Sequence, residues 1–144
     1  MQTNSPPPKY FIGTLTTRAS RKLTAYYNRV LAPLGLTYQQ AMALGIIRRE
    51  EAISLGVFAE RYGVGKAAAV TMIERLEAMG LVTREPHPTD GRLNAIRLTV
   101  RARTLLPEIL EEVNKLEKTV ESALGIADLE TLVRGLKVIC NTDL

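Results

Sequence analysis

The side chains whose types and spacing could do chemistry are concentrated in the middle of the chain. Lys66 lies in the first turn of a predicted helix, and Thr71 and Arg75 follow one and two turns later on its outward side. Arg92 follows Asp90 by two residues in a glycine-containing loop. Ammonium, hydroxyl and guanidinium groups donate hydrogen bonds to phosphate oxygens and to base edges. The pattern therefore favours contact with a nucleic acid.

A helix-turn-helix would position the first of these groups. The segment Phe58–Val64 has the features that such a turn needs. The small Ala59 lets the next helix cross closely, and Gly63 can adopt the left-handed backbone conformation of the turn. The second helix would then enter a major groove as a recognition helix. The residues that it would present are Lys66, Ala67, Ala68, Thr71 and Arg75.

A hairpin would position the second group. Residues 81–85 and 94–98 read as strands, and Asp90-Gly91 supplies a tight turn between them. Arg84 and Arg97 lie on these strands, where each could contact a phosphate or pair with a carboxylate of the hairpin. The sequence thus predicts a β-hairpin with Asp90 and Arg92 near its tip.

Long amphipathic helices are expected on both sides of this region. Apolar residues at steps of three and four define them, and Thr37 to Gln40 fit a capping box. We interpret residues 50–53 as a short connector and Asp128 as the cap of the last helix. The expected elements are helices over 10–31, 37–49, 55–62 and 66–79, strands over 81–85 and 94–98, and two helices separated by Gly125. This is a mainly α fold with a small β-hairpin.

Charge is distributed unevenly along the 144 residues, whose net charge is +4. Through Arg103 there are 15 Lys and Arg against 7 Asp and Glu, and after it there are 4 against 8. A basic body joined to an acidic tail indicates a polyanionic partner at one end only. A helical tail that is acidic for no functional reason is an equally weighted alternative.

The composition excludes several classes of protein. A hydrophobic fraction of 46% with 24% charged residues is typical of a globular protein. Uncharged apolar stretches fall far short of the roughly 18 residues of a membrane span. The single Cys140 and the single His87 exclude a disulfide framework and a Cys–His metal cluster, and we expect neither a metal nor a cofactor. The first nine residues have no apolar segment, so we expect a cytoplasmic protein.

The region from 54 to 99 resembles the MarR family of winged helix-turn-helix transcriptional regulators. The segment Glu74–Val82 carries the best match, and Asp90-Gly91-Arg92 followed by Leu98-Thr99 reproduces the family's Asp-x-Arg…Leu-Thr signature. The order of elements is similar from Tyr10 to Ile139. The signature is specific, whereas the order of elements alone would not be.

The resemblance implies a ligand-responsive regulator, a repressor, which binds a palindromic operator in double-stranded DNA as a homodimer. The recognition helix would lie in the major groove, while Arg92 enters the minor groove and Asp90 steadies the wing through an ion pair. The chain would divide into a flexible arm (1–9), a dimerisation helix (10–35), the winged helix-turn-helix DNA-binding domain (36–99) and C-terminal dimerisation helices (100–144).

Two features depart from the family. The recognition helix has Ala67, Ala68 and Val70 where the family usually places Ser, Thr and Arg. Base readout would therefore be weighted towards A·T content, groove shape and wing contacts, because alanine cannot make bidentate hydrogen bonds. Phe11 and Ile12 stand where the peroxide-sensing branch has a cysteine, so we expect no thiol sensing by that route.

The resemblance also implies a small aromatic or carboxylate effector bound between the head and the dimer domain. Tyr26, Tyr27 and Tyr38 could supply its aromatic wall and Arg18 its cationic partner, although tyrosines at such positions more often serve packing.

Two other function classes are weighed against the regulator. An enzyme would need a base, a nucleophile or a metal cluster, whereas His87 is flanked by prolines and no glycine-rich phosphate loop occurs. We therefore expect no catalysis. The stronger alternative is a winged-helix dimer that serves as a protein-interaction module with little sequence-specific DNA binding. The alanine-rich recognition helix favours it, and Arg92 and the basic body argue against it.

Overall fold

The computed structural model describes residues 6–50, 52–91 and 94–144. The mainly helical fold with a small sheet, expected from the sequence, is confirmed. The elements in chain order are α1 (Ile12–Leu31), η1 (Ala32–Leu34), α2 (Tyr38–Arg48), β1 (Ile53–Ser54), α3 (Leu55–Tyr62), α4 (Lys66–Ala78), β2 (Val82–Pro86), β3 (Asn94–Leu98), α5 (Val100–Leu124) and α6 (Ile126–Asn141).

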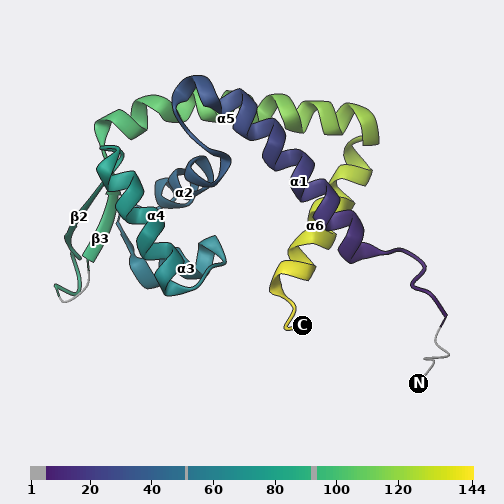
Figure 1. Ribbon diagram of the computed structural model, residues 1–144, viewed down its shortest axis with the longest axis horizontal. Coiled ribbons are helices and arrows are strands. Elements are labelled where there is room, and N and C mark those ends of the chain that lie inside the picture. Colours follow the sequence, from purple (N-terminus) through teal and green to yellow (C-terminus); the bar gives the residue numbers. More distant parts are fainter. Residues whose placement is uncertain (1–5, 51, 92–93) are drawn as a thin grey trace.

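The molecule is elongated, and α5 runs along its length (Figure 1). At one end of α5 lie α2, α3, α4 and the three strands, which we call the head. At the other end lie α6 and much of α1, and we call α1, α5 and α6 the handle. The C-terminus and the first described residues lie on the handle side of the molecule.

Side-chain caps fix where several helices begin. At the start of α2, Gln40 N donates to Thr37 Oγ1 at 3.2 Å and Thr37 N donates to Gln40 Oε1 at 2.9 Å, so the expected capping box is confirmed. The expectation for α6 is wrong, because Gly125 is its N-cap and Asp128 lies in the first turn. A carboxylate there still interacts favourably with the helix dipole.

The sheet has three antiparallel strands in the order β1-β3-β2, one more than the expected hairpin. The third strand is β1, which pairs Ile53 with Ile96 and Ser54 with Ala95. It includes Ile53, the end of the segment that we interpret from sequence as a connector. A strand of two residues is too short for an alternating pattern to reveal it.

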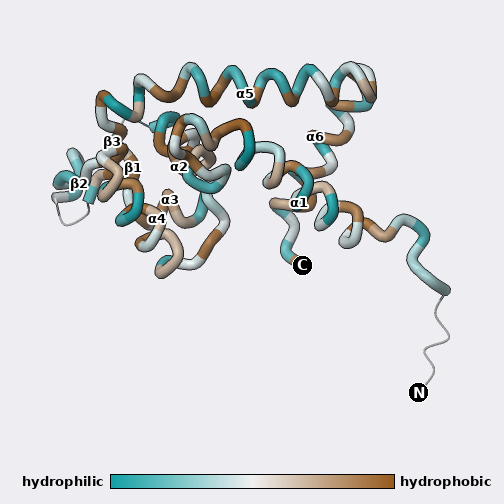
Figure 2. Tube along the Cα trace, turned by 45° about the horizontal axis from the view of Figure 1, so that its top comes forward, coloured by the Kyte–Doolittle hydropathy of each residue, from teal (hydrophilic) through white to brown (hydrophobic). Residues whose placement is uncertain are grey.

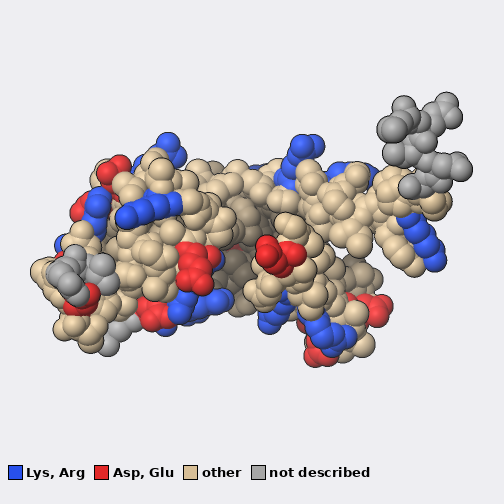
Figure 3. Space-filling model, turned by 90° about the horizontal axis from the view of Figure 1, so that it is seen from below, with Lys and Arg blue, Asp and Glu red and all other residues tan. Residues whose placement is uncertain are grey.

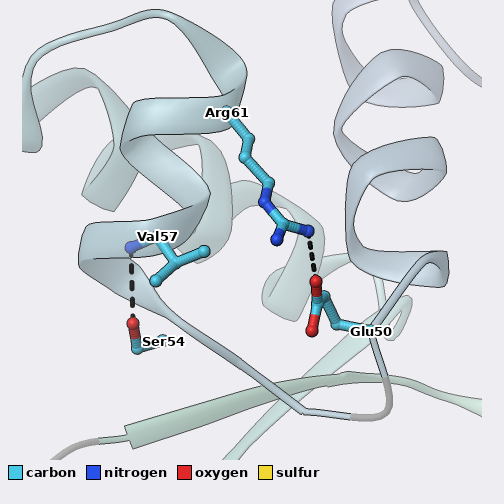
Figure 4. A network of polar contacts seen from close by, with 4 residues as sticks. All are labelled: Glu50, Ser54, Val57 and Arg61. Carbon is cyan, nitrogen blue, oxygen red and sulfur yellow. Dashed lines mark hydrogen bonds and ion pairs between the residues drawn. The ribbon is translucent and has the colours of Figure 1, made fainter.

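The connector before α3 also carries polar contacts that hold this helix in place (Figure 4). Val57 N donates to Ser54 Oγ at 3.3 Å, which caps α3. Arg61 of α3 forms an ion pair with Glu50, just beyond the end of α2. These contacts fix the first helix of the helix-turn-helix against the helix before it.

The hydrophobic core lies in the head and in the parts of α1 and α5 that cover it. Phe58, Ile73 and Leu76 are fully buried there. Ala102 and Ile109 of α5 belong to the same cluster. By contrast, α6 has no buried residue along its fully described length, although its apolar residues are visible in Figure 2.

In the described part of the chain, no single helix is long and apolar enough to cross a membrane. The segments Ile12–Leu34 and Tyr38–Arg48 meet the length and composition criteria only when taken together, across a bend of 79°.

Candidate nucleic-acid interface

The turn between α3 and α4 has the geometry expected from its sequence. Gly63 ends α3 with a φ of 75°, in the left-handed region that glycine adopts without strain. The amides of Gly63 and Val64 both donate to the carbonyl of Ala59, at 3.0 and 3.1 Å. Ala59 itself is buried, so its small side chain allows α4 to cross α3 closely.

The two faces of α4 differ as a recognition helix requires. Ala69, Ile73 and Leu76 have no exposed surface and pack into the head. The outward residues that the sequence predicts for base and phosphate contact are all exposed, and they are Lys66, Ala67, Ala68, Thr71 and Arg75. Ala67, Ala68, Thr71 and Arg75 share one helix face and Lys66 stands at the amino end of the helix, so all five can approach a single groove.

The polar side chains of α4 that could contact DNA differ in whether they already have a partner within the chain. Thr71 Oγ1 donates to Ala67 O at 3.1 Å, which leaves its oxygen available as an acceptor. The side chains of Lys66 and Arg75 form no hydrogen bond or ion pair with any other described residue. Both cations are therefore available to a ligand from outside the chain.

A groove runs beside Lys66, which sequence reasoning did not identify. It lies where the amino ends of α3 and α4 meet the first residue of β3. Its lining includes Ser54, Leu55, Gly56, Val57, Glu60, Lys66 and Asn94. Asn94 directly follows the wing loop in the sequence, and this position is the one signal from which its place in the groove could have been predicted.

The strands of the wing are held by ion pairs. Arg84 of β2 donates to Glu77 of α4 through two nitrogens, at 3.0 and 2.8 Å. Arg97 Nε of β3 lies 3.2 Å from Glu85 Oε2 of β2. Arg97 thus has the expected pairing within the hairpin, whereas Arg84 pairs with a carboxylate of the recognition helix, which the sequence did not predict. The first pair also ties the wing to the recognition helix.

Two predicted site residues remain, Asp90 and Arg92. Asp90 is half-buried and comes just before Gly91. Arg92 lies outside the described residues.

The positive charge of the basic body lies mostly outside the head. Residues 36–99 carry 8 Lys and Arg against 7 Asp and Glu. Three of these cations, Arg61, Arg84 and Arg97, are paired with carboxylates. The remaining excess lies mainly on α1 and at the start of α5. Seen from below, Lys and Arg form small separate groups among uncharged surface (Figure 3). A DNA contact would therefore rest on a few cations.

The three tyrosines predicted for an effector site lie together. The rings of Tyr27 and Tyr38 stack with centroids 4.6 Å apart, and Tyr26 meets Tyr27 edge-on at 5.4 Å. Burial raises the pKa of Tyr27 to about 12 and raises the pKa of Tyr38 as well. Phenol groups are protonated at neutral pH and can donate hydrogen bonds to a ligand.

The cation beside these rings differs from the one named from the sequence. The guanidinium of Arg29 lies 5.6 Å from the ring centroid of Tyr26. Arg18 is exposed two turns earlier on α1 and interacts with no other described residue. Among the described residues, no group of three or more His, Cys, Asp or Glu side chains could hold a metal ion.

Comparison with known proteins covers both the head and the handle. A model of the MarR family matches residues 34–93. The chain is 31% identical over 81 residues to the organic hydroperoxide resistance transcriptional regulator of Bacillus subtilis, with 56% of this chain and 55% of that protein aligned. The match thus spans about half the length of that relative. This chain is also 28% identical over 123 residues to the HTH-type transcriptional regulator MgrA of Staphylococcus aureus, and the alignment covers 84% of this chain and 82% of MgrA.

The fold agrees with these similarities. A mutant of MarR from E. coli, solved in complex with operator DNA, superposes with a TM-score of 0.80 at 26% identity. That superposition covers 89% of this chain and 92% of the MarR chain. The curated relatives are transcriptional regulators, and the segment matched by the family model spans the head from α2 to the residue before β3, including the exposed face of α4. The segment 34–93 of this chain thus matches the MarR family, and the fold of the chain is that of the MarR winged helix-turn-helix transcriptional regulator.

Proposed function

We propose that this chain acts as a homodimer that binds a palindromic DNA operator and represses transcription until a small ligand binds. The observation that carries the proposal is the exposed surface of α4, with Arg75 on its outward face and Lys66 at its amino end. Neither cation has an ion-pair partner among the described residues. A similar fold binds operator DNA in the MarR complex. In each head, α4 enters the major groove and the wing contacts the minor groove.

The wing part of the proposal rests on the family signature. Arg92 enters the minor groove and Asp90 steadies the loop that carries it. The ion pairs of Arg84 with Glu77 and of Arg97 with Glu85 support a wing held in a fixed position relative to α4. Arg84 and Arg97 then serve the frame of the wing.

The homodimer is supported by apolar side chains that the single chain leaves exposed on α1 and α6. Each is between 40% and 56% exposed, although each lies on the apolar side of an amphipathic helix. The residues are Leu15 of α1 and Leu132, Val133, Leu136 and Ile139 of α6. A second copy that covers these faces would place two heads to read two half-sites.

For the effector we propose an aromatic or carboxylate compound near Tyr26, Tyr27 and Tyr38. Protonated phenols would donate to its oxygens, and Arg29 or Arg18 would neutralise its charge. We further propose that the protein is cytoplasmic and has no catalytic activity of its own, in keeping with relatives that are transcriptional regulators.

A salt titration of duplex binding tests the proposed function. The probe is the duplex that the protein itself selects from a random pool. Three cations in each head, namely Lys66, Arg75 and Arg92, would bring about six positive charges to the DNA in a dimer and release about as many counterions, whether they contact phosphates or base edges. The logarithm of the association constant should then fall with the logarithm of salt concentration with a slope of about −5. Repeating the selection with aromatic acids present would test the effector.

The alternative, a protein-interaction module, predicts a different result. Without phosphate contacts the chain would bind no duplex even at about 50 mM salt, where electrostatic binding is strong. That outcome would refute the regulator and leave the interaction module as the better account.

Substitutions on α4 test how bases are read. We expect Lys66→Ala and Thr71→Ala each to lower the affinity for the selected duplex by about tenfold, because a good base contact is worth roughly 1–3 kcal/mol. Each substitution should also reduce the ratio of the affinity for the selected duplex to the affinity for a scrambled duplex. Ala68→Ser, which adds a hydroxyl to the same exposed face, should alter the preferred sequence. An unchanged sequence preference in all three variants would show that α4 does not read bases.

A further inference from the structure

The carboxyl end of α4 is joined to the amino end of α5 by three hydrogen bonds. Thr99 Oγ1 donates to Gly80 O at 2.7 Å, and Thr99 N donates to Leu81 O at 3.1 Å. Arg101 Nη1 donates to Met79 O at 2.7 Å. We call this set of contacts, between residues 79–81 and residues 99 and 101, the clamp.

The clamp uses carbonyl groups that the end of α4 leaves available. The closing amides of this helix, those of Met79, Gly80 and Leu81, donate back to carbonyls of residues 75–77. The carbonyls of the same three residues lie beyond the last turn and need other donors. A guanidinium at this place also interacts favourably with the negative end of the helix dipole.

Thr99 belongs to both helices. Its Oγ1 accepts from Ala102 N at 3.2 Å and so caps α5, while its hydroxyl hydrogen is donated to Gly80 at the end of α4. Arg101 adds a second attachment from the first turn of α5. With both contacts in place, the end of α4 cannot turn relative to α5 without breaking a hydrogen bond.

From this geometry we infer that Arg101 is a positioning residue for DNA recognition, and that it acts without touching DNA. The inference rests on the proposed function. Arg101 fixes the orientation of the end of α4 relative to α5, and α5 is one continuous helix that runs from the head to α6. In a dimer, the arrangement of the two handles would thereby determine the relative positions and orientations of the two recognition helices.

The test compares two arginines of α5. Arg101→Met removes the donor to Met79 but keeps the length of the side chain. Arg103→Met removes the same charge two residues later, where the exposed side chain interacts with no described residue. We expect Arg101→Met to weaken binding to the selected duplex by about threefold to tenfold, the size of one net hydrogen bond. Arg103→Met should bind like the wild type.

Two readouts separate positioning from direct contact. Binding of Arg101→Met to a scrambled duplex and its salt slope should match the wild type, because no phosphate contact is lost. Arg101→Lys, which keeps a donor, should restore most of the affinity. The inference is overturned if Arg101→Met binds the selected duplex normally, if its salt slope becomes shallower by about one or more, or if Arg103→Met loses as much affinity.

Hydrogen exchange of the DNA-free protein gives an independent arm. Amides in the segment 76–82 should exchange severalfold faster in Arg101→Met and unchanged in Arg103→Met. If the wild type binds no duplex, the proposed function fails, while faster exchange in Arg101→Met alone still supports the clamp. Unchanged exchange in Arg101→Met would overturn the clamp whatever the DNA result.

Discussion

Replacing Leu136 of α6 with glutamate is expected to yield single chains in solution and to weaken binding to the selected duplex by about 10²- to 10⁴-fold. Leu136 is 42% exposed in the single chain and lies on the apolar side of α6 with Leu132, Val133 and Ile139. A carboxylate at this position would have to lose its hydration in the dimer without a partner, which is costly. Without a second head, the gain in effective concentration from bivalent binding is lost.

Val138→Glu is the matched control for this substitution. Val138 lies on the same helix and is 60% exposed, but the helical spacing places it away from the stripe of Leu132 and Leu136. It introduces the same negative charge, so general repulsion from DNA affects both variants equally. Light scattering measures the oligomeric state of each variant, and duplex titration at one salt concentration measures its affinity for the selected duplex. A Leu136→Glu protein that remains dimeric would refute the proposed role of this face.

The second large effect is expected in the core of the head. Phe58 has no exposed surface, and its ring stacks on that of Tyr62 with centroids 5.3 Å apart. Phe58→Ala should lower the free energy of unfolding by about 3–5 kcal/mol, which combines lost burial with the cavity left behind. Domains are stable by only about 5–15 kcal/mol. The head of this variant, including the packing of α3 against α4, should therefore unfold at a lower temperature than in the wild type.

Denaturant unfolding at a fixed protein concentration measures this loss, since the stability of a dimer depends on concentration. Val57→Ala is the control one residue earlier on α3. Val57 is 39% exposed, and substitutions at exposed positions usually change stability by about 0.5 kcal/mol or less. Equal unfolding midpoints for Phe58→Ala and the wild type would mean that Phe58 does not hold the head together.

Local rules account for the parts of the fold that could be predicted from the sequence. The capping box at Thr37, the left-handed Gly63 and the inward Ile73 follow from the geometry of a single turn or of one helix. The outward positions of Lys66 and Arg75 follow from the same helical period. For each of these, neighbouring residues contain the whole physical cause.

What could not be predicted depends on residues that are distant in the chain. The strand β1 exists because Ile53 pairs with Ile96, and two residues carry no detectable pattern. The choice of Arg84 between phosphate and carboxylate was open until the turn of β2 against α4 placed Glu77 within 3.0 Å. No sequence feature distinguishes Arg101 from an ordinary exposed cation, because its partner is a backbone carbonyl 22 positions earlier.

The absence of any buried residue in α6 ties the folding of this helix to the amount of protein present. A helix of 16 residues is marginal in water without tertiary packing. The exposed apolar face of α6 gains that packing only when a second copy covers it, as in the proposed homodimer. Copies made while the protein is scarce would carry a frayed C-terminal segment open to proteases. Proteases would therefore remove the protein faster at low concentration than at high concentration. The lifetime of the chain would increase with its concentration.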